Sequence, residues 1–325
     1  MKKIITVDAP ARIHLGFLET NENSQRKFGS IGLGISYYKN IFKIESSNKK
    51  DVVCKNKTLK KKIFKIMSIF SKFKTIKNCK ITVNQNIPFH EGLGSGTQHS
   101  LTTGFLISEF NNLKMSIEQI SELLDRGRRS GIGIEVFKNG GFVIDVGKKK
   151  DSKLLPLKIF EYKWPKKWKI ILIQDESFFG LHGQNEKKEF LNIKKIKKSF
   201  AQENCFETIM KILPGIIEND FDNFTKGVSV IQKNMSKIFY GKSNQYASKK
   251  ITKIFNYLNV NGYYGYGQSS WGPTGFVFCE NDKSSLNLLK DIQNFIELKK
   301  IQGINLRIVE GRNKGKIKTT RIKDD

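Results

Sequence analysis

The fold of this chain is decided by one stretch of sequence, Pro88-Phe89-His90-Glu91-Gly92-Leu93-Gly94-Ser95-Gly96-Thr97-Gln98. This glycine-rich segment leads straight into an apolar stretch over residues 97–110, which we predict to be a buried helix. Glycines let backbone N–H groups approach an anion, and the start of a helix adds unpaired donors and a positive dipole end. The segment therefore suits a phosphate or a pyrophosphate. It is not a Walker A loop, because no Gly-Lys-Ser or Gly-Lys-Thr follows.

Two more segments, one near each end of the chain, accompany this loop. The first is Pro10-Ala11-Arg12-Ile13-His14-Leu15-Gly16, and the second is Gly267-Gln268-Ser269-Ser270-Trp271-Gly272-Pro273-Thr274-Gly275. In this order the three segments resemble the three motifs of the GHMP kinase superfamily. The resemblance implies an α+β, two-domain GHMP-kinase-like fold. Its N-terminal domain is of the ribosomal protein S5 domain 2-like type, and its C-terminal domain is an α/β ferredoxin-like domain.

The length and patterning of the chain agree with that architecture. At 325 residues it exceeds the usual size of a single domain, yet no Pro-rich or Ser-rich linker divides it. Strands and helices alternate without a βαβ rhythm, which favours α+β over a doubly wound sheet. We predict an N-terminal GHMP-type domain with the glycine loop over residues 1–150, a C-terminal GHMP-type domain over residues 151–310, and a flexible polar tail over residues 311–325.

Hydrophobic periodicity predicts the individual elements. We expect strands at residues 4–7, 41–44, 80–83 and 169–173, and two more around Gly140 and Gly141. Helices are expected around residues 59–70, 97–110, 116–125, 200–217, 221–238 and 247–258. The spacing from Ser116 to Gln119 fits a capping box at the start of one of them.

A narrower resemblance rests on stretches that go beyond the superfamily pattern. Residues 94–98, 126–133, 140–145 and 267–274 are all similar to signatures of the β-ribofuranosylaminobenzene 5′-phosphate synthase family. Members of that family are decarboxylating pentosyltransferases in the biosynthesis of tetrahydromethanopterin-type coenzymes. The resemblance implies that phosphoribosyl pyrophosphate is condensed with 4-aminobenzoate or 4-hydroxybenzoate, with release of pyrophosphate and carbon dioxide. The choice between the two benzoates stays open, as do the metal ligands.

One departure from the kinases favours a transferase. Many GHMP kinases carry a catalytic Asp seven positions before a Gly-Gly pair, and that position here is Gly133. A glycine cannot orient a hydroxyl group or take its proton, so phosphoryl transfer to an alcohol loses a base or an electrostatic element. Some kinases of the superfamily manage without this Asp.

A donor that carries a 5′-phosphate and a pyrophosphate needs cations and neutral hydrogen-bond donors. Three closely spaced arginines supply guanidinium groups that bind phosphate oxygens in pairs. We assign substrate binding to Arg12, to the loop residues Gly92, Leu93, Gly94, Ser95, Gly96, Thr97 and Gln98, and to Arg126, Arg128, Arg129, Ser130, Gln268, Ser269, Ser270 and Trp271. Trp271 is a candidate to pack against the aromatic ring, although core packing explains it equally well.

The candidate catalytic residues are His14, His90, Glu91 and Asp145. Arg12 and His14 lie in a motif of the family and are placed to contact the benzoate carboxylate or a phosphate. Acid or base function is assigned to His90 and Glu91, with loop capping as the alternative for Glu91. Asp145 is assigned a magnesium or ribose-hydroxyl role. Magnesium itself follows from the resemblance, since no cluster of carboxylates in the sequence fixes a metal site.

Composition bounds the remaining possibilities. The formal net charge of +28 would attract a polyanion, but the lysines are spread through Lys/Asn/Ile-rich stretches without a nucleic-acid-binding signature. Four widely spaced cysteines indicate reduced core thiols rather than disulfides or a zinc site. No apolar run reaches the ~20 residues needed to cross a bilayer. We therefore expect a cytoplasmic protein, and the resemblance implies a homodimer that works on small molecules.

Two alternative functions stay in view. One is an ATP-dependent small-molecule kinase of the same GHMP fold. The other is a basic protein that binds nucleic acid through its charge, in which case affinity would fall steeply with salt. The transferase hypothesis is preferred because the narrower resemblance and the glycine at position 133 point to it together. That resemblance rests on residues 94–98, 126–133, 140–145 and 267–274.

Overall fold

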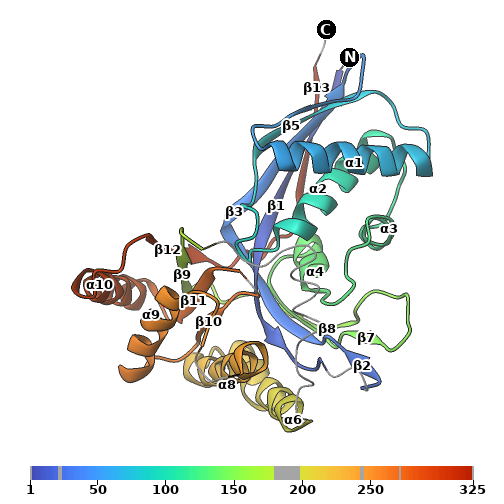
Figure 1. Ribbon diagram of the computed structural model, residues 1–325. Coiled ribbons are helices and arrows are strands. Elements are labelled where there is room, and N and C mark those ends of the chain that lie inside the picture. The colour runs from blue at the N-terminus through green and yellow to red at the C-terminus, as the bar shows by residue number, and fades with distance from the viewer. Residues whose placement is uncertain (1, 21–23, 179–197, 242–244, 271, 324–325) are drawn as a thin grey trace.

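The computed structural model describes residues 2–20, 24–178, 198–241, 245–270 and 272–323. Two long antiparallel strands, β1 (Lys2–Phe17) and β3 (Ser30–Ser46), run through the centre of the molecule (Figure 1). They anchor a seven-stranded sheet. Its other members are β4 (Asp51–Val53), β5 (Cys79–Gln85), β6 (Phe142–Asp145), β8 (Lys158–Tyr162) and β13 (Ile317–Lys323). A short hairpin of β2 (Arg26–Lys27) and β7 (Lys148–Lys149) lies apart from it.

Four helices cover the upper part of this sheet (Figure 1). They are α1 (Lys57–Phe73), α2 (Ser95–Phe110), α3 (Ile117–Leu123) and α4 (Ile132–Lys138). Helix α1 forms where the sequence predicts it, because the apolar side chains recur at helical spacing and the Asn56 side chain caps its first turn. The predicted capping box of α3 is confirmed by the reciprocal bonds between Ser116 and Gln119.

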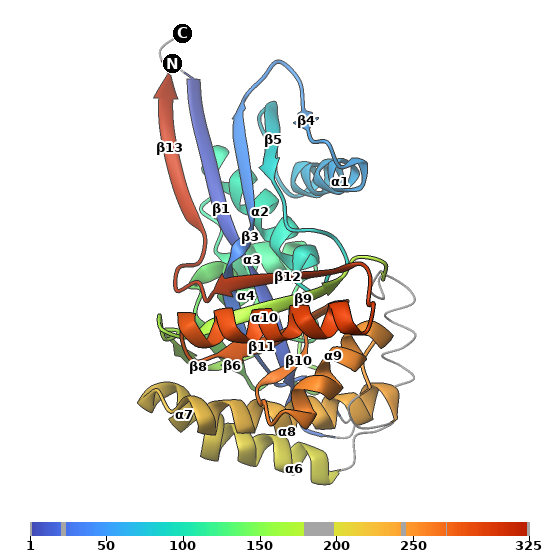
Figure 2. The ribbon, with the colours of Figure 1, turned by 90° about the vertical axis from the view of Figure 1, so that its left-hand side faces the viewer.

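The second sheet has the strand order β10-β11-β9-β12 and is antiparallel throughout. Its elements follow the chain as β9 (Lys169–Asp175), α9 (Lys249–Val260), β10 (Tyr266–Gln268), β11 (Thr274–Cys279), α10 (Asp282–Leu298) and β12 (Ile304–Glu310). Figure 2 shows α10 lying across this sheet. A βαββαβ order with the first strand inside the sheet is the ferredoxin-like arrangement, so the predicted α+β fold is confirmed.

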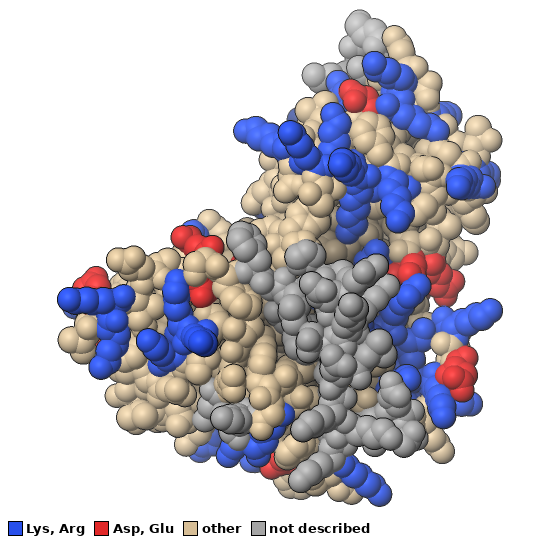
Figure 3. All heavy atoms as spheres, viewed as in Figure 1, with Lys and Arg blue, Asp and Glu red and all other residues tan. Residues whose placement is uncertain are grey.

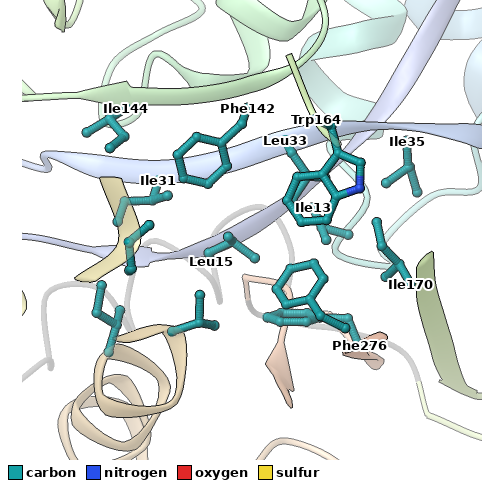
Figure 4. Packing of buried hydrophobic residues seen from close by; sticks show 14 of the residues in the cluster. Ile13, Leu15, Ile31, Leu33, Ile35, Phe142, Ile144, Trp164, Ile170 and Phe276 are labelled. Carbon is teal, nitrogen blue, oxygen red and sulfur yellow. The ribbon is translucent and has the colours of Figure 1, made fainter. Parts of the chain in front are cut away.

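One apolar core joins the two sheets. Ile13 and Leu15 of β1 meet Phe142 of β6 and Phe276 of β11 in this core, and Trp164 closes it (Figure 4). A helical layer of α6 (Lys198–Glu207), a π-helical segment (Thr208–Ile212), α7 (Leu213–Glu218) and α8 (Phe221–Tyr240) seals the open side. Each fully buried large side chain contributes about 1.5–3 kcal/mol. This shared core fixes the position of residues 10–16 relative to residues 267–275.

Two sequence predictions are wrong. The segment before Gly140 is helix α4 and not a strand, because residues 132–137 are buried on all sides between α2, β1 and β6. The tail is not mobile over residues 317–323, because it forms β13 and pairs with β1 from Lys2↔Lys323 to Asp8↔Ile317. Lysine-rich polar strands are typical of sheet edges, so polarity alone did not indicate disorder here.

The division of the chain at residue 150 stays a prediction. Strands β8 and β13 come after that point in the sequence and still pair with strands of the first half. Among the described residues, no helix is both long and apolar enough to cross a membrane.

Candidate functional site

The three glycine-rich or motif segments meet at the junction of the two sheets. Arg12 Nη1 donates to the carbonyl oxygen of Gly92 at 2.6 Å, and Arg12 N donates to Leu93 O at 3.2 Å. Ser269 Oγ donates to the same Gly92 oxygen at 2.7 Å and accepts from His14 N at 3.0 Å. The sequence placed these residues in one site, and the structure brings them into direct contact.

The contact between the second and third segments is too close for any side chain. A Cβ atom on Gly92 would stand 2.2 Å from Ser269 O, and a Cβ on Gly272 would stand 2.1 Å from Gly92 N. Gly92 also has φ = 74°. Glycine is therefore required at both positions by backbone packing, independently of any ligand.

The far end of the loop is open. Gly94 caps α2 with φ = 79°, and Ser95 and Gly96 form the first turn of the helix, whose N–H groups have no partner within the helix. A Cβ atom on Gly96 would meet nothing within 4 Å. Gly96 and Thr97 are half-buried, while Leu93 is fully enclosed. The empty space at Gly96 leaves room for an anion beside the helix start.

Lys62 of α1 is a site residue that the sequence analysis missed. Its Nζ donates to Gly96 O at 2.6 Å. Burial, together with the nearby charge of Arg126, lowers the pKa of Lys62 to about 7. A signal was present, because Lys62 follows Leu59 by three positions and precedes Ile66 by four, so it lies in the buried row of the helix.

The three arginines of residues 126–129 point to three different places. Arg126 is mostly buried and its charge acts on Lys62, beside the open end of the loop. Arg129 acts on His14 at the domain junction. Arg128 is exposed and forms an ion pair with Asp125. The structure thus brings Arg126 and Arg129 into the site but does not bring Arg128 there.

His14 is buried and neutral. Burial holds the pKa of its imidazole well below the usual range, with Arg12 and Arg129 acting in the same direction. Its Nδ1 accepts from Gly16 N at 3.3 Å, while its Nε2 has no hydrogen-bond partner among the described residues. The ring lies 4.7 Å from that of Phe17.

Asp145 has its hydrogen-bonding capacity engaged within the chain. Its Oδ2 accepts from Ser30 Oγ at 2.6 Å and from Gly131 N at 3.0 Å, and its Oδ1 accepts from Gly147 N at 2.8 Å. Burial raises its pKa to about 7 against these hydrogen bonds. The contacts make Asp145 a positioning residue for the segment that carries Arg129, and a catalytic role stays a prediction. Ser130 belongs to the same network, because its Oγ lies 2.7 Å from Ser30 Oγ.

Gln98 and Thr97 face helix α4. Gln98 is fully buried and its Nε2 donates to Gly133 O at 2.7 Å, so it holds α2 against α4 rather than facing the open end of the loop. A Cβ on Gly133 would stand 3.1 Å from Thr97 Cγ2. Position 133 is the one at which many GHMP kinases carry Asp. Here the Thr97 side chain lies against the space that the Cβ atom of such a residue would occupy.

His90 and Glu91 lie on the other side of the loop. His90 has φ = 62°, as a turn before the glycines requires. Glu91 reaches the end of β9, where Gln174 Nε2 donates to its Oε2 at 3.4 Å. Burial raises the pKa of Glu91, and the neighbouring Glu176 and Asp175 add to that effect. A carboxyl group with a raised pKa is a candidate acid, and this assignment stays a prediction.

The remaining predicted residues belong to the last segment. Gln268 Oε1 accepts from Ala247 N at 2.7 Å and its Nε2 donates to Tyr240 Oη at 3.1 Å, which makes it a support of the local structure. Ser270 has φ = 57° and lines a pocket together with His14. Trp271 lies outside the described residues. Within the described ranges, no group of three or more His, Cys, Asp or Glu side chains is arranged to hold a metal ion.

Comparisons with known proteins identify the family and the fold. Residues 59–142 match the model of the GHMP kinases N terminal domain. The chain is 27% identical over 333 residues to a β-ribofuranosylphenol 5′-phosphate synthase of Methanothermobacter thermautotrophicus, covering 96% of this chain and 97% of the relative. It is 30% identical over 305 residues to a protein of the same name from Methanocaldococcus jannaschii, covering 84% and 88%.

Solved structures share the fold at low sequence identity. A homoserine kinase from Cytophaga hutchinsonii superposes with a TM-score of 0.66 at 16% identity, with 97% of both chains covered. A mevalonate pyrophosphate decarboxylase from Streptococcus pyogenes gives a TM-score of 0.66 at 14% identity and covers 95% of this chain and 97% of its own. At such identities the likeness confirms the GHMP fold and carries nothing about substrates.

Proposed function

This chain belongs to the β-ribofuranosylphenol 5′-phosphate synthase family, and from that premise we propose that it condenses phosphoribosyl pyrophosphate with a para-substituted benzoate. Carbon dioxide and pyrophosphate are the leaving products, and the pathway is the synthesis of a tetrahydromethanopterin-type coenzyme. The names of the relatives favour a phenol as product, so the proposed acceptor is 4-hydroxybenzoate rather than 4-aminobenzoate.

The observation that carries this proposal is the open helix start at Ser95 and Gly96, with two cations beside it. Lys62 and Arg126 are both partly buried. Burial and the charge of Arg126 lower the pKa of Lys62. Like charges so placed are stabilised when a polyanion binds between them. Backbone N–H groups and two cations suit the pyrophosphate of the donor.

The chemistry follows from charge. As the bond between the anomeric carbon and pyrophosphate breaks, the ribose becomes oxocarbenium-like and both electrons leave with pyrophosphate. Donors aimed at the departing oxygens stabilise that charge. The ring carbon that bears the carboxylate attacks the anomeric carbon, and the carbon–carboxylate bond then breaks to return its electrons to the ring. The enzyme's part is to hold the two reactants in contact and to stabilise the leaving group.

A magnesium ion and a homodimer are also proposed, both on the family resemblance. Magnesium commonly binds through substrate phosphates with few protein ligands, and there it would offset the charge of the leaving group. The described residues offer no carboxylate cage, so we derive no step through the metal. Activity measured with and without a chelator tests the ion, and light scattering in solution tests the dimer.

The decisive assay uses carboxyl-labelled 4-hydroxybenzoate and 4-aminobenzoate, each with phosphoribosyl pyrophosphate. We expect labelled carbon dioxide and pyrophosphate in equal amounts, dependent on the ribosyl donor. No release with either benzoate would reject the proposal.

A parallel incubation with ATP tests the kinase alternative, which Gly133 disfavours by lacking the carboxylate. The nucleic-acid alternative is also disfavoured. On the face in Figure 3, Lys and Arg side chains are spread over both ends of the molecule with acidic residues among them, rather than gathered in one stripe.

A further inference from the structure

A pocket beside His14 lies at the junction of β1, α8 and the last glycine-rich segment. Its walls are largely aromatic or thioether side chains: Phe17, Met235, Phe239, Tyr240 and Tyr246. Polar groups in the lining come from His14, Gln232, Ser236, Gln268 and Ser270. Such a combination of apolar walls and a few polar atoms is typical of a site for a small aromatic molecule.

The orphan atom in this pocket is a hydrogen-bond donor. His14 is neutral, and its Nδ1 accepts the hydrogen bond from Gly16 N, so the ring proton is on Nε2. That N–H group is buried and has no partner among the described residues. A buried donor without an acceptor is destabilising, and a ligand oxygen at this position would supply the missing acceptor.

The size of the pocket selects the part of the ligand that enters it. The pocket offers about 20 Å³ of free space, which is close to what one water molecule needs. A single oxygen on the tip of a ring fits this space. The ring itself would lie at the mouth, on the side of Ser270, which adjoins the contact between Ser269 and the glycine loop.

The charges around His14 act on such an oxygen too. Arg12 and Arg129 both disfavour a proton on the imidazole. The same positive field favours the ionised form of a phenol held against Nε2. Tyr240 and Tyr246 line the pocket as neutral phenols, since burial raises the pKa of Tyr240 to about 12 and that of Tyr246 further. Among the described residues, the charged groups that act on the His14 ring are thus two cations, Arg12 and Arg129, and no anion.

We propose that His14 is the residue that selects the acceptor: its Nε2–H group binds the para oxygen of 4-hydroxybenzoate and holds it as a phenolate. This inference rests on the proposed function and adds the acceptor subsite to it. The phenol proton leaves to bulk water on binding. The negative charge raises electron density on the ring carbon para to the oxygen, which is the carbon that bonds to the ribose. After that bond forms the oxygen is a carbonyl of a dienone, and loss of carbon dioxide restores the phenolate.

The proposal makes a chemical distinction between the two benzoates. A phenolate oxygen is a strong acceptor for an N–H donor, and the amine nitrogen of 4-aminobenzoate is a poor one. A site built to hydrogen-bond one group discriminates against an analogue that leaves the donor unpaired. His14 thus acts on the specificity for the acceptor and not on donor binding.

Two variants and two readouts test this. His14→Phe removes the donor, and His14→Gln keeps an N–H group at similar reach. We expect His14→Phe to lower the ratio of kcat/KM for 4-hydroxybenzoate over 4-aminobenzoate by about 10- to 100-fold, with partial recovery in His14→Gln. The second readout is the absorption spectrum of 4-hydroxybenzoate mixed with the enzyme near neutral pH, where the wild type should produce the phenolate band and His14→Phe should not.

His99→Gln is the matched control, because His99 is an equally buried histidine whose Nε2 already contacts Ile87 O at 3.0 Å. It should leave the acceptor ratio unchanged. Equal losses for both benzoates in His14→Phe, or a bound ligand that stays a phenol in the wild type, overturn the inference. If neither benzoate is turned over by the wild type, the proposed function fails, and the phenolate band still decides whether His14 binds a phenol.

Discussion

Glycine serves different purposes in the loop before α2 and in the last glycine-rich segment, residues 267–275. In the last segment a Cβ atom would collide at Gly267 with the Gln232 side chain at 2.1 Å and at Gly272 with the backbone of Gly92 at 2.1 Å. In the loop before α2, Gly96 has open space where a Cβ would stand. The last segment packs tightly against its neighbours, which is possible only because its glycines carry no side chains; we call it the clamp. The loop before α2 ends in exposed backbone N–H donors.

The difference teaches that glycine content alone does not identify a binding loop. Gly92 belongs to both arrangements. It packs against Ser269 of the last segment, and the chain that follows it leads to the open start of α2. A substitution in the clamp should damage the fold, and a substitution at the open end should affect ligand binding only.

The largest effect is expected from Gly272→Ala. The new Cβ would meet backbone atoms of Glu91 and Gly92, which cannot rotate away. We expect a loss of about 3 kcal/mol in the free energy of unfolding, measured by urea denaturation, together with loss of activity. A variant with wild-type stability would show that the two segments are not clamped.

Ser269→Ala should come next. The hydroxyl group links Gly92 O to His14 N from a fully buried position. Its removal leaves the His14 N–H group without that acceptor, and we expect a cost of about 2 kcal/mol in the same denaturation experiment. Ser121→Ala is the control, because this equally buried hydroxyl makes only a local bond to Ile117 O and should cost less. Equal costs would contradict a special role for Ser269.

Lys62→Met tests the open end. The KM for phosphoribosyl pyrophosphate should rise about tenfold, while Lys65→Met, on an exposed position of the same helix, should change nothing. Because the pKa of Lys62 is about 7, the charged form that attracts an anion dominates below pH 7 and is lost above it. Donor affinity of the wild type should therefore fall as pH rises through 7, and Lys62→Met should lack that part of the dependence. An unchanged pH profile in Lys62→Met would remove Lys62 from the donor site.

The smallest effect on stability is expected from Gly96→Ala. The position is in the first turn of α2, and the added methyl group meets no atom within 4 Å. We expect the free energy of unfolding to stay within about 0.5 kcal/mol of the wild type, while the KM for the donor rises because the methyl group stands where the anion approaches. A fall in stability like that of Gly272→Ala would erase the distinction between the two segments.

The sequence predicted the fold and the meeting of the three segments because the relevant signals are local. Glycines, a proline and the start of an apolar helix mark the loop, and the order of the three motifs indicates their arrangement in space. The sequence assigned all three arginines to substrate binding. The structure separates the exposed Arg128, which pairs with Asp125, from Arg126 and Arg129.

The remaining features depend on contacts that no local pattern reports. The spacing of Lys62 places it in the buried row of its helix, but only the approach of α1 to the glycine loop gives it a role. Ile132, Ile134 and Val136 alternate like a strand, but alternation carries no information when every position is buried. Asp145 was assigned a magnesium or ribose-hydroxyl role, which stays a prediction. No local pattern indicated its hydrogen bonds to Ser30, Gly131 and Gly147.

The pairing of β13 with β1 has a consequence for how the protein is made. Strand β1 is synthesised early and lies between β3 and β13, so one of its edges stays unpaired until the ribosome has released residues 317–323. An open strand edge invites pairing with other chains. During translation the nascent chain is therefore most exposed to misassembly along β1, and the lysines that line its late partner also keep the finished edge soluble.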